Sequence, residues 1–270
     1  MINSSIVEFA KKHQLPSAEN RGVFNFHRAY SQDIEHDKTY NYPRVWTLQH
    51  LYTDGLTTKI DQGSTFPVYL TPKYKLSVYD VMLGLRNHYQ ATDHDAYAHC
   101  NPNDSYRPIA VFRTEHSHVL HVRPQLPIAI GEVQYIAYGM TALSVYLPFY
   151  QGMTSVPEVL TIGENTADSH SAYWKFRKLQ TLAMMNWNKF APVVQQAYHD
   201  FEQQTAHKQQ LMEAEYLTLY VLHPQQAIER INTFEHEILA LALALTEELT
   251  NELFTLLTIE TDKLYNFSGA

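Results

Sequence analysis

Histidines and arginines gather in residues 106–124, which read YRPIAVFRTEHSHVLHVRP. Imidazoles bind metals and carry protons, and guanidinium groups bind carboxylates through paired hydrogen bonds. We interpret the segment as paired β-strands, in which residues two apart share a face. His116 and His118 would then point to one side and His121 to the other, so one strand cannot bring all three to one ion. Half-buried histidines bonded to neighbours are favoured over a metal site.

A second candidate metal site lies in TDHDAYAHC, residues 92–100, which contains five possible ligands: Asp93, His94, Asp95, His99 and Cys100. Zinc sites usually pair ligands two to four residues apart and take the others from a second element. No matching pair occurs elsewhere in the chain, and aspartates that cap turns are common in polar loops. We therefore expect no metal at this segment. The alternative is a metal-dependent hydrolase that uses His94, His99, His116 and His118.

Cys100, the single cysteine of the chain, is a candidate nucleophile. It follows a polar loop, without the G-x-S-x-G or P-loop patterns that mark nucleophile or phosphate sites. A pair with His88, His94 or His99 is conceivable, but a buried or incidental cysteine is the commoner case. One cysteine excludes an internal disulfide framework and fits a reducing, cytoplasmic location.

Three arginines lie among aromatic residues in stretches that we interpret as non-helical: Arg44 in YNYPRVW, Arg107 in YRPI, and Arg113. A guanidinium group in such surroundings could hold a substrate carboxylate in bidentate fashion. It could equally stack on the aromatic rings to hold a loop. Both interpretations stay open.

The periodicity of the chain predicts an α+β protein. A capping box of Ser5 and Glu8 would open a helix that ends near residue 14, and residues 19–75 read as loops with short strands at most. Ser77 and Asp80 would cap a helix over 77–89, and three or four antiparallel strands should follow between residues 108 and 149. From residue 169 the pattern is helical, with Pro192 and Pro224 each opening a new helix.

The composition excludes several classes of protein. The chain has 270 residues, enough for one large or two small domains, with 45% hydrophobic and 18% charged residues, so it is not disordered. A net charge of -8 argues against binding to nucleic acid. The start of the chain does not resemble a signal peptide, and the longest apolar run, residues 238–246, is too short to span a membrane.

Seven motifs, in this order and approximate spacing, resemble the C69 dipeptidases of lactic-acid bacteria: VFNFHRAY, YNYPRVW, HYQATDHDAY, SYRPIAVFRTEHSHVLHVRP, VQYIAYG, SVYLPFY and ADSHSAYWKFRKLQTLA. The resemblance spans about residues 6–201. It implies an N-terminal nucleophile hydrolase with an αββα sandwich, a cysteine nucleophile that begins the mature chain, dipeptide substrates and no cofactor. It points to the following substrate-binding candidates: Asn41, Arg44, His88, Arg107, Arg113, Glu115 and His118.

The resemblance also implies that the nucleophile-bearing part lies upstream of the matching segment, since Ile2 has neither thiol nor hydroxyl and Cys100 matches no catalytic position. We therefore expect the C-terminal part of the sandwich in residues 1–164, a helical region in 165–270, and an inactive chain in isolation. A sheet without its facing sheet would leave apolar side chains and an edge uncovered, so solubility should be poor. The alternative is a non-catalytic subunit that completes a separately encoded nucleophile half; a homo-oligomer is also possible.

Overall fold

The computed structural model describes residues 3–15, 19–20, 23–32, 34–60, 63, 66–99 and 106–265. The chain divides into two compact units. The first comprises Met1–Lys75 with Pro102–Arg107, and the second comprises Leu76–Asn101 with Pro108–Ala270. This division into compact units does not test the predicted domain boundary between residues 164 and 165, which stays a prediction.

The regular elements of the first unit are mainly helices. Its elements are α1 (Ser4–Lys12), the antiparallel pair β1 (Glu19–Asn20) and β2 (Val23–Phe24), α2 (Phe26–Tyr30), α3 (Asp37–Tyr40) and α4 (Tyr42–Tyr52). The prediction of loops across residues 19–75 was wrong for α4, an eleven-residue helix. Pro43 lies in its first turn, where a proline fits because the missing N–H would have no partner within the helix. Arg44 is consequently helical and not in a loop.

The N-cap of helix α1 lies two residues before the predicted cap. The side chain of Asn3 accepts a hydrogen bond from the backbone N–H of Ser5 at 3.0 Å, so Asn3 is the N-cap. The predicted capping box of Ser5 and Glu8 was wrong, because Asn caps a helix as well as Ser does and stands at an earlier position. The helix ends at Lys12, two residues before the predicted end at Gln14.

The second unit contains a three-stranded antiparallel sheet, with β3 (His116–Val122), β4 (Glu132–Tyr138) and β5 (Leu147–Tyr150) in that order. The short helix α7 (Ile128–Gly131) lies between β3 and β4. Three antiparallel strands are confirmed, but their predicted start at residue 108 was wrong, and residues 106–124 contain one strand instead of two. The backbone N–H groups of Ala110 and Phe112 bond to the Asn87 carbonyl and the Tyr97 hydroxyl, both at 3.0 Å, and not to a partner strand.

Helix α5 (Val78–Leu85) has the predicted capping box, with the Ser77 side chain accepting from the Asp80 N–H and the Asp80 side chain accepting from the Ser77 N–H. It ends earlier than expected, because Arg86 already forms the C-cap. The four-residue helix α6 (Ala96–His99) and the 3-10 helices Thr141–Leu143 and Glu158–Leu160 follow in loops.

Three long helices complete the second unit: α8 (Ala172–Met185), α9 (Trp187–Leu219) and α10 (Pro224–Leu264). Pro224 opens α10 as predicted, but Pro192 lies inside α9. The predicted single helix before Pro192 is instead broken at Asn186, whose φ of -147° and ψ of 77° are not helical. Pro192 lies beyond the first turn of α9, so it removes one backbone hydrogen bond from the helix without ending it.

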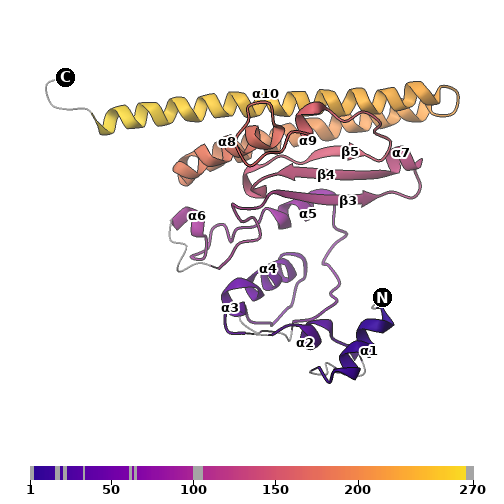
Figure 1. Cartoon of the computed structure of the whole chain (residues 1–270), viewed down its shortest axis with the longest axis vertical. Coiled ribbons are helices and arrows are strands. Elements are labelled where there is room, and N and C mark those ends of the chain that lie inside the picture. Colours follow the sequence, from indigo (N-terminus) through magenta and orange to yellow (C-terminus); the bar gives the residue numbers. More distant parts are fainter. Residues whose placement is uncertain are drawn as a thin grey trace. The chain divides into compact units, whose positions relative to one another are not determined.

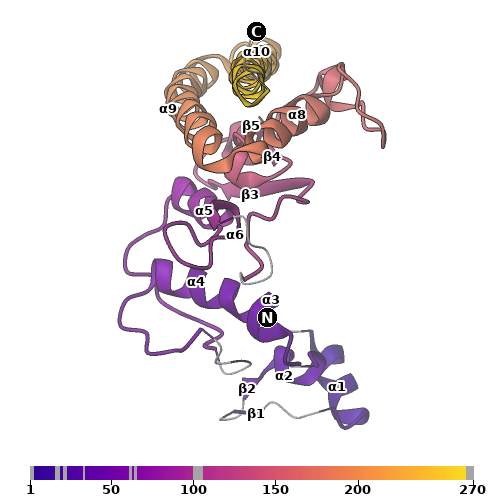
Figure 2. The same ribbon diagram turned by 90° about the vertical axis from the view of Figure 1, so that its left-hand side faces the viewer.

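The sheet lies between helices within the second unit (Figure 1). On one side, Val119 of β3 and Ala137 of β4 pack with Met82 of α5 and with Tyr146. On the other side, the ring of Tyr138 stacks on Phe176 of α8 at 5.9 Å. Figure 2 looks along α10 and shows α8 and α9 on its two sides. The buried face of α10 carries Ile231, Ile238, Leu239 and Ala242.

The described structure is therefore α+β: mostly helical, with one small antiparallel sheet of three strands and a long helical C-terminal part. Among the described residues, no helix is both long and apolar enough to cross a membrane.

Candidate active-site elements

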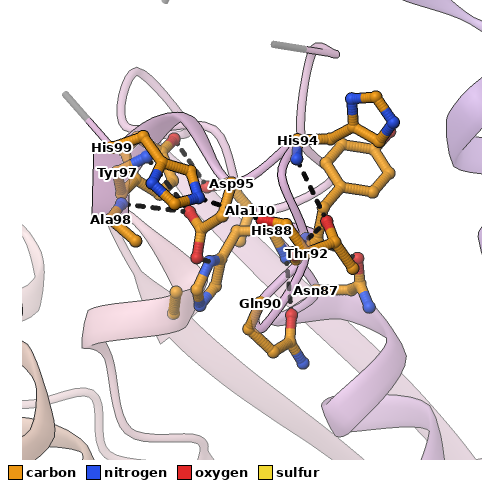
Figure 3. A network of polar contacts seen from close by, with 12 residues as sticks. Asn87, His88, Gln90, Thr92, His94, Asp95, Tyr97, Ala98, His99 and Ala110 are labelled. Carbon is orange, nitrogen blue, oxygen red and sulfur yellow. Dashed lines mark hydrogen bonds and ion pairs between the residues drawn. The ribbon is translucent and has the colours of Figure 1, made fainter. Parts of the chain in front are cut away.

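His88 forms a buried pair with Asp95 in the segment between α5 and α6. The imidazole Nδ1 lies 3.1 Å from Asp95 Oδ2, and only 6% of His88 is exposed. Figure 3 shows the His88 ring directed at the carboxylate. Tyr89 and Ala91 have φ values of 62° and 61°, a left-handed conformation that is uncommon for residues with a side chain. These two residues fold the segment back so that Asp95 reaches the histidine.

Aromatic rings and backbone groups fix this pair. Trp187, the first residue of α9, meets the His88 ring edge-on at 5.0 Å. Asp95 Oδ1 accepts the backbone N–H of Tyr97 at 3.1 Å, which closes the start of α6. The Tyr97 hydroxyl donates to the carbonyl oxygen of Ala110 at 3.0 Å, and burial raises its pKa to about 12. Tyr97 is thus neutral at physiological pH and ties the segment to residue 110.

A carboxylate on Nδ1 selects the tautomer of a histidine and fixes the plane of its ring. The ring nitrogen Nε2 has no hydrogen-bond partner among the described residues. The pair could therefore carry a proton at Nε2, but its burial also makes it a structural link between the 87–99 segment and α9. The sequence motif singled out both residues, although Asp95 was weighed as a metal ligand and not as the partner of His88.

His116 and His118 lie on the exposed face of β3, as the alternation predicted, with ring centroids 5.7 Å apart. They line a hollow of about 290 Å³ together with Leu85, Ile109, Thr114, Ser117 and Thr141. His121 points to the opposite face, where burial and the charge of Arg123 lower its pKa. Arg113 and Glu115 precede β3 and are exposed, and the Glu115 carbonyl accepts the N–H of Gly139 at 2.7 Å.

In the first unit, two arginines approach one tyrosine ring. The guanidinium carbon of Arg107 lies 4.3 Å from the centroid of Tyr40, and that of Arg44 lies 5.8 Å from it. Arg44 Nε donates to the Tyr40 carbonyl at 3.0 Å, and its Nη2 donates to the side chain of Asn41. Asn41 in turn donates to the buried Asp37. Asn41, Arg44 and Arg107 thus form one cluster, whereas the other four candidates belong to the second unit.

The structure offers no ligand set for the alternative metal site. Within the described ranges, no three His, Cys, Asp or Glu side chains converge. His94 lies apart from Asp95 and His99 (Figure 3), and His99 Nε2 is 3.2 Å from the Thr92 carbonyl. Cys100 lies outside the described residues, so its predicted pairing with a histidine stays a prediction.

The sequence analysis did not anticipate a largely buried ion pair between α5 and α9. Arg86, at the end of α5, donates through Nη1 to Glu202 of α9 at 3.1 Å and through Nη2 to the second carboxylate oxygen. Its guanidinium group also covers the ring of Tyr146 at 4.9 Å. The residues are 116 positions apart, and no local pattern signals such a contact.

Comparison with known proteins identifies the family. The sequence model of Peptidase family C69 matches residues 1–200, which is most of the chain. The chain belongs to Peptidase family C69. This C69 chain is 60% identical over 153 residues to a probable dipeptidase of Salmonella dublin, a match that covers 57% of the chain and 35% of the relative.

Two further relatives of this C69 chain come from lactic-acid bacteria. A probable dipeptidase of Latilactobacillus sakei is 28% identical over 192 residues, covering 70% of the chain and 40% of the relative. Dipeptidase A of Lactobacillus helveticus is 29% identical over 143 residues, covering 52% and 30%. The chain therefore matches only 30% to 40% of the length of these relatives. The family resemblance inferred from the seven motifs is confirmed.

Proposed function

We propose that this chain supplies the substrate-binding part of a cytoplasmic C69 dipeptidase. The observation that carries the proposal is the family match over residues 1–200, together with relatives named as dipeptidases. The proposed reaction is hydrolysis of a dipeptide by a cysteine-type N-terminal nucleophile, in which the thiol attacks the carbonyl carbon and the free amine of the same residue takes the proton. The proposed frame for this chemistry is an αββα sandwich to which β3, β4 and β5 contribute.

The proposal places the nucleophile outside these 270 residues. The relatives extend well beyond the part that matches this chain, which leaves room for a nucleophile-bearing portion. Cys100, the single cysteine, is not assigned that role. On this proposal the isolated chain does not turn over dipeptides, because no covalent intermediate can form without the thiol.

The proposed binding group for the substrate carboxylate is the pair Arg44 and Arg107. Two guanidinium groups on one tyrosine ring concentrate positive charge, and the helix α4 and the Asn41 contact hold Arg44 in place. Arginine forks match a carboxylate in geometry and charge. Arg113, Glu115, His88 and His118 are proposed as further groups that bind or position the substrate.

A second candidate function is that of a partner subunit that completes a separately encoded nucleophile half. The observation in its favour is the outer strand β3, which pairs with β4 alone among the described strands. Leu120 and Val122 on its open face are 65% and 64% exposed. The unpaired edge of an outer strand is a site for the addition of a further strand.

The proposed function is tested by measuring amino-acid release from dipeptides. The purified chain is assayed alone and after co-expression with the portion of the Salmonella dublin relative that lies outside its match to this chain. We expect turnover only from the co-expressed pair, lost when the cysteine nucleophile of that portion is replaced by alanine. Turnover by the chain alone, unchanged in Cys100→Ala, would contradict the proposal.

Two variants distinguish binding from folding in the active pair. Arg107→Lys keeps the charge but removes the bidentate fork, so KM should rise with little change in kcat. Lys59→Arg, in the same unit and outside the Tyr40 cluster, is the matched control and should leave both constants unchanged. An unaltered KM in Arg107→Lys would exclude Arg107 as the carboxylate group.

A further inference from the structure

A groove of about 470 Å³ lies in the second unit, apart from the residues assigned to the proposed dipeptidase site. Its walls come from residues 167–169, from α8 and from the middle of α10, two helices that pack against each other. The volume lies in the range of pockets that bind small molecules.

The apolar part of the groove is formed by Trp174 and Leu182 on α8. The indole N–H of Trp174 donates to the carbonyl of Glu164 at 2.9 Å, which fixes the plane of the ring. The groove is also lined by Thr246, whose buried hydroxyl group lies 2.8 Å from that of Tyr198. A side chain of aliphatic or aromatic character could therefore rest on the indole and Leu182 without displacing any of these bonds.

Charges of both signs line the same groove. Lys175 and Lys178 come from α8, and Glu247 comes from α10. None of these three side chains has an ion pair or hydrogen bond within the part of the chain that the structure describes, whereas the exposed Lys189 and Lys208 pair with Glu260 and Glu237. The other charges of the groove are engaged, since Asp168 bonds to His170.

Arg177 also lines the groove, but its guanidinium group donates to the carbonyls of Phe112 at 2.6 Å and Thr114 at 2.8 Å. It is therefore committed to the fold. What remains for a ligand is two ammonium groups, one carboxylate and an apolar wall. A ligand whose carboxylate contacts the two lysines and whose ammonium group contacts Glu247 would satisfy all three charges at once.

We propose that this groove binds a zwitterion of amino-acid or dipeptide size with an apolar side chain. Its carboxylate lies at Lys175 and Lys178, its ammonium group at Glu247, and its side chain on Trp174 and Leu182. The site is distinct from the Arg44 and Arg107 cluster, and the proposal does not depend on dipeptidase activity.

The test is a titration of the full chain followed by NMR of the tryptophan indole N–H signals. The Trp174 signal is identified by its absence from Trp174→Phe. The probes are L-leucine, the dipeptide Leu-Leu, N-acetyl-leucine, which lacks the ammonium group, and leucinamide, which lacks the carboxylate. We expect saturable shifts of the Trp174 signal with leucine or Leu-Leu, and binding at least tenfold weaker for the two blocked compounds. Whichever of L-leucine and Leu-Leu binds more tightly shows whether the groove prefers an amino acid or a dipeptide.

Lys178→Gln and Glu247→Gln test the charges separately, since both residues are exposed and their replacement leaves the core intact. Each should weaken binding of the zwitterion at least tenfold, and Glu247→Gln should leave the weak binding of N-acetyl-leucine unchanged. Lys208→Gln, outside the groove, is the control. The proposal is overturned if neither zwitterion gives a saturable shift, if N-acetyl-leucine binds as tightly as leucine, or if both groove variants bind like the unmodified chain.

Discussion

At the scale of single residues, buried polar contacts hold the candidate site together. Asp95 accepts from His88 and from two backbone N–H groups of α6, so one carboxylate satisfies three donors in a segment with little regular structure. The buried side chain of Gln180 likewise satisfies two backbone groups. It donates to the carbonyl of Tyr138 and accepts from the N–H of Met140.

Replacing Asp95 tests whether the pair with His88 holds the 87–99 segment. Asp95→Ala leaves buried donors without partners, which should lower the free energy of unfolding by about 1–3 kcal/mol. Asp95→Asn retains one acceptor oxygen and should cost less. Urea unfolding followed by circular dichroism measures both, with the exposed neighbour Asp93→Ala as the control. Equal stability of Asp95→Ala and the control would contradict the structural role.

Gly139 is a position where a side chain cannot be accommodated. Its φ is 73°, and an added Cβ would lie 2.2 Å from Gln180 Oε1. Gly139→Ala should therefore lower the melting temperature through left-handed strain, which costs about 1–2 kcal/mol, and through displacement of Gln180. Gly55 has the same φ of 73° with no atom within 4 Å, so Gly55→Ala measures the strain alone. A similar loss in both variants would mean that Gln180 moves without cost.

At the scale of elements, charged side chains join helices to the sheet. Arg86 and Glu202 connect α5 to α9, and Glu202 also accepts the backbone N–H of Tyr146 at 2.7 Å. Glu235 of α10 accepts the backbone N–H of Tyr150 on β5. Such contacts fix how the helices lie on the sheet, and they are costly to break because each leaves a buried group without its partner.

Breaking the ion pair between α5 and α9 should strongly destabilise the second unit. Glu202→Ala leaves the guanidinium group of Arg86 buried without its carboxylate, with an expected loss of about 3–5 kcal/mol. Replacing both residues, as in Arg86→Met with Glu202→Leu, should lose much less. Chemical denaturation of the two variants is the measurement. A double variant that is less stable than Glu202→Ala would show that the pair itself is the stabilising feature.

Glu235 should make stability depend on pH in the neutral range. Burial raises its pKa from 4.5 to about 7 in the folded protein. The folded state therefore binds more protons than the unfolded state between these values, so the contribution of Glu235 to stability is greatest below pH 4.5 and is lost as the pH rises through about 7. The expected fall attributable to this group is about 3 kcal/mol.

Glu235→Gln keeps an acceptor for Tyr150 and cannot ionise, so this part of the pH dependence should disappear. Urea unfolding at several values between about pH 5 and about pH 8 measures the difference. Glu237→Gln, an exposed residue paired with Lys208, is the control. An unchanged pH profile in Glu235→Gln would assign the dependence to other groups.

At the scale of the whole molecule, the family match and the hydrophobic core end at different residues. The match ends at residue 200, yet the buried residues of the second unit continue through α10 to Leu253. Figure 1 shows α10 running along α8 and α9 and beyond the end of α8. The region outside the match is therefore part of the same hydrophobic core as the sheet.

Truncation tests this dependence. Removal of all residues after Leu219 deletes α10 and exposes the core that Ile231, Phe234 and Ile238 cover, so cooperative unfolding should be lost. Removal of residues after Thr258 retains the buried part of α10 and should change the melting temperature little. Calorimetry distinguishes the two. A cooperative transition in the shorter chain would show that the sheet and α8 form a core without α10.

The sequence by itself determined the features that depend on near neighbours. Ser77 and Asp80 are three residues apart and cap α5 as predicted, Pro224 opens α10, and the alternation of β3 places His116 and His118 on one face. The seven motifs also sufficed for the family. Capping, proline geometry and strand alternation act within one or two turns of the chain, so they can be read locally.

The tertiary structure decided what depends on distant partners. Residues 108–115 have strand-like alternation but bond to Asn87 and Tyr97 instead of a strand, and Arg44 became helical although its aromatic neighbours suggested a loop. The partners of Arg86 and Glu235 are 116 and 85 positions away. Backbone groups and buried charges take whichever partner the packed chain brings within reach, and no local pattern records that choice.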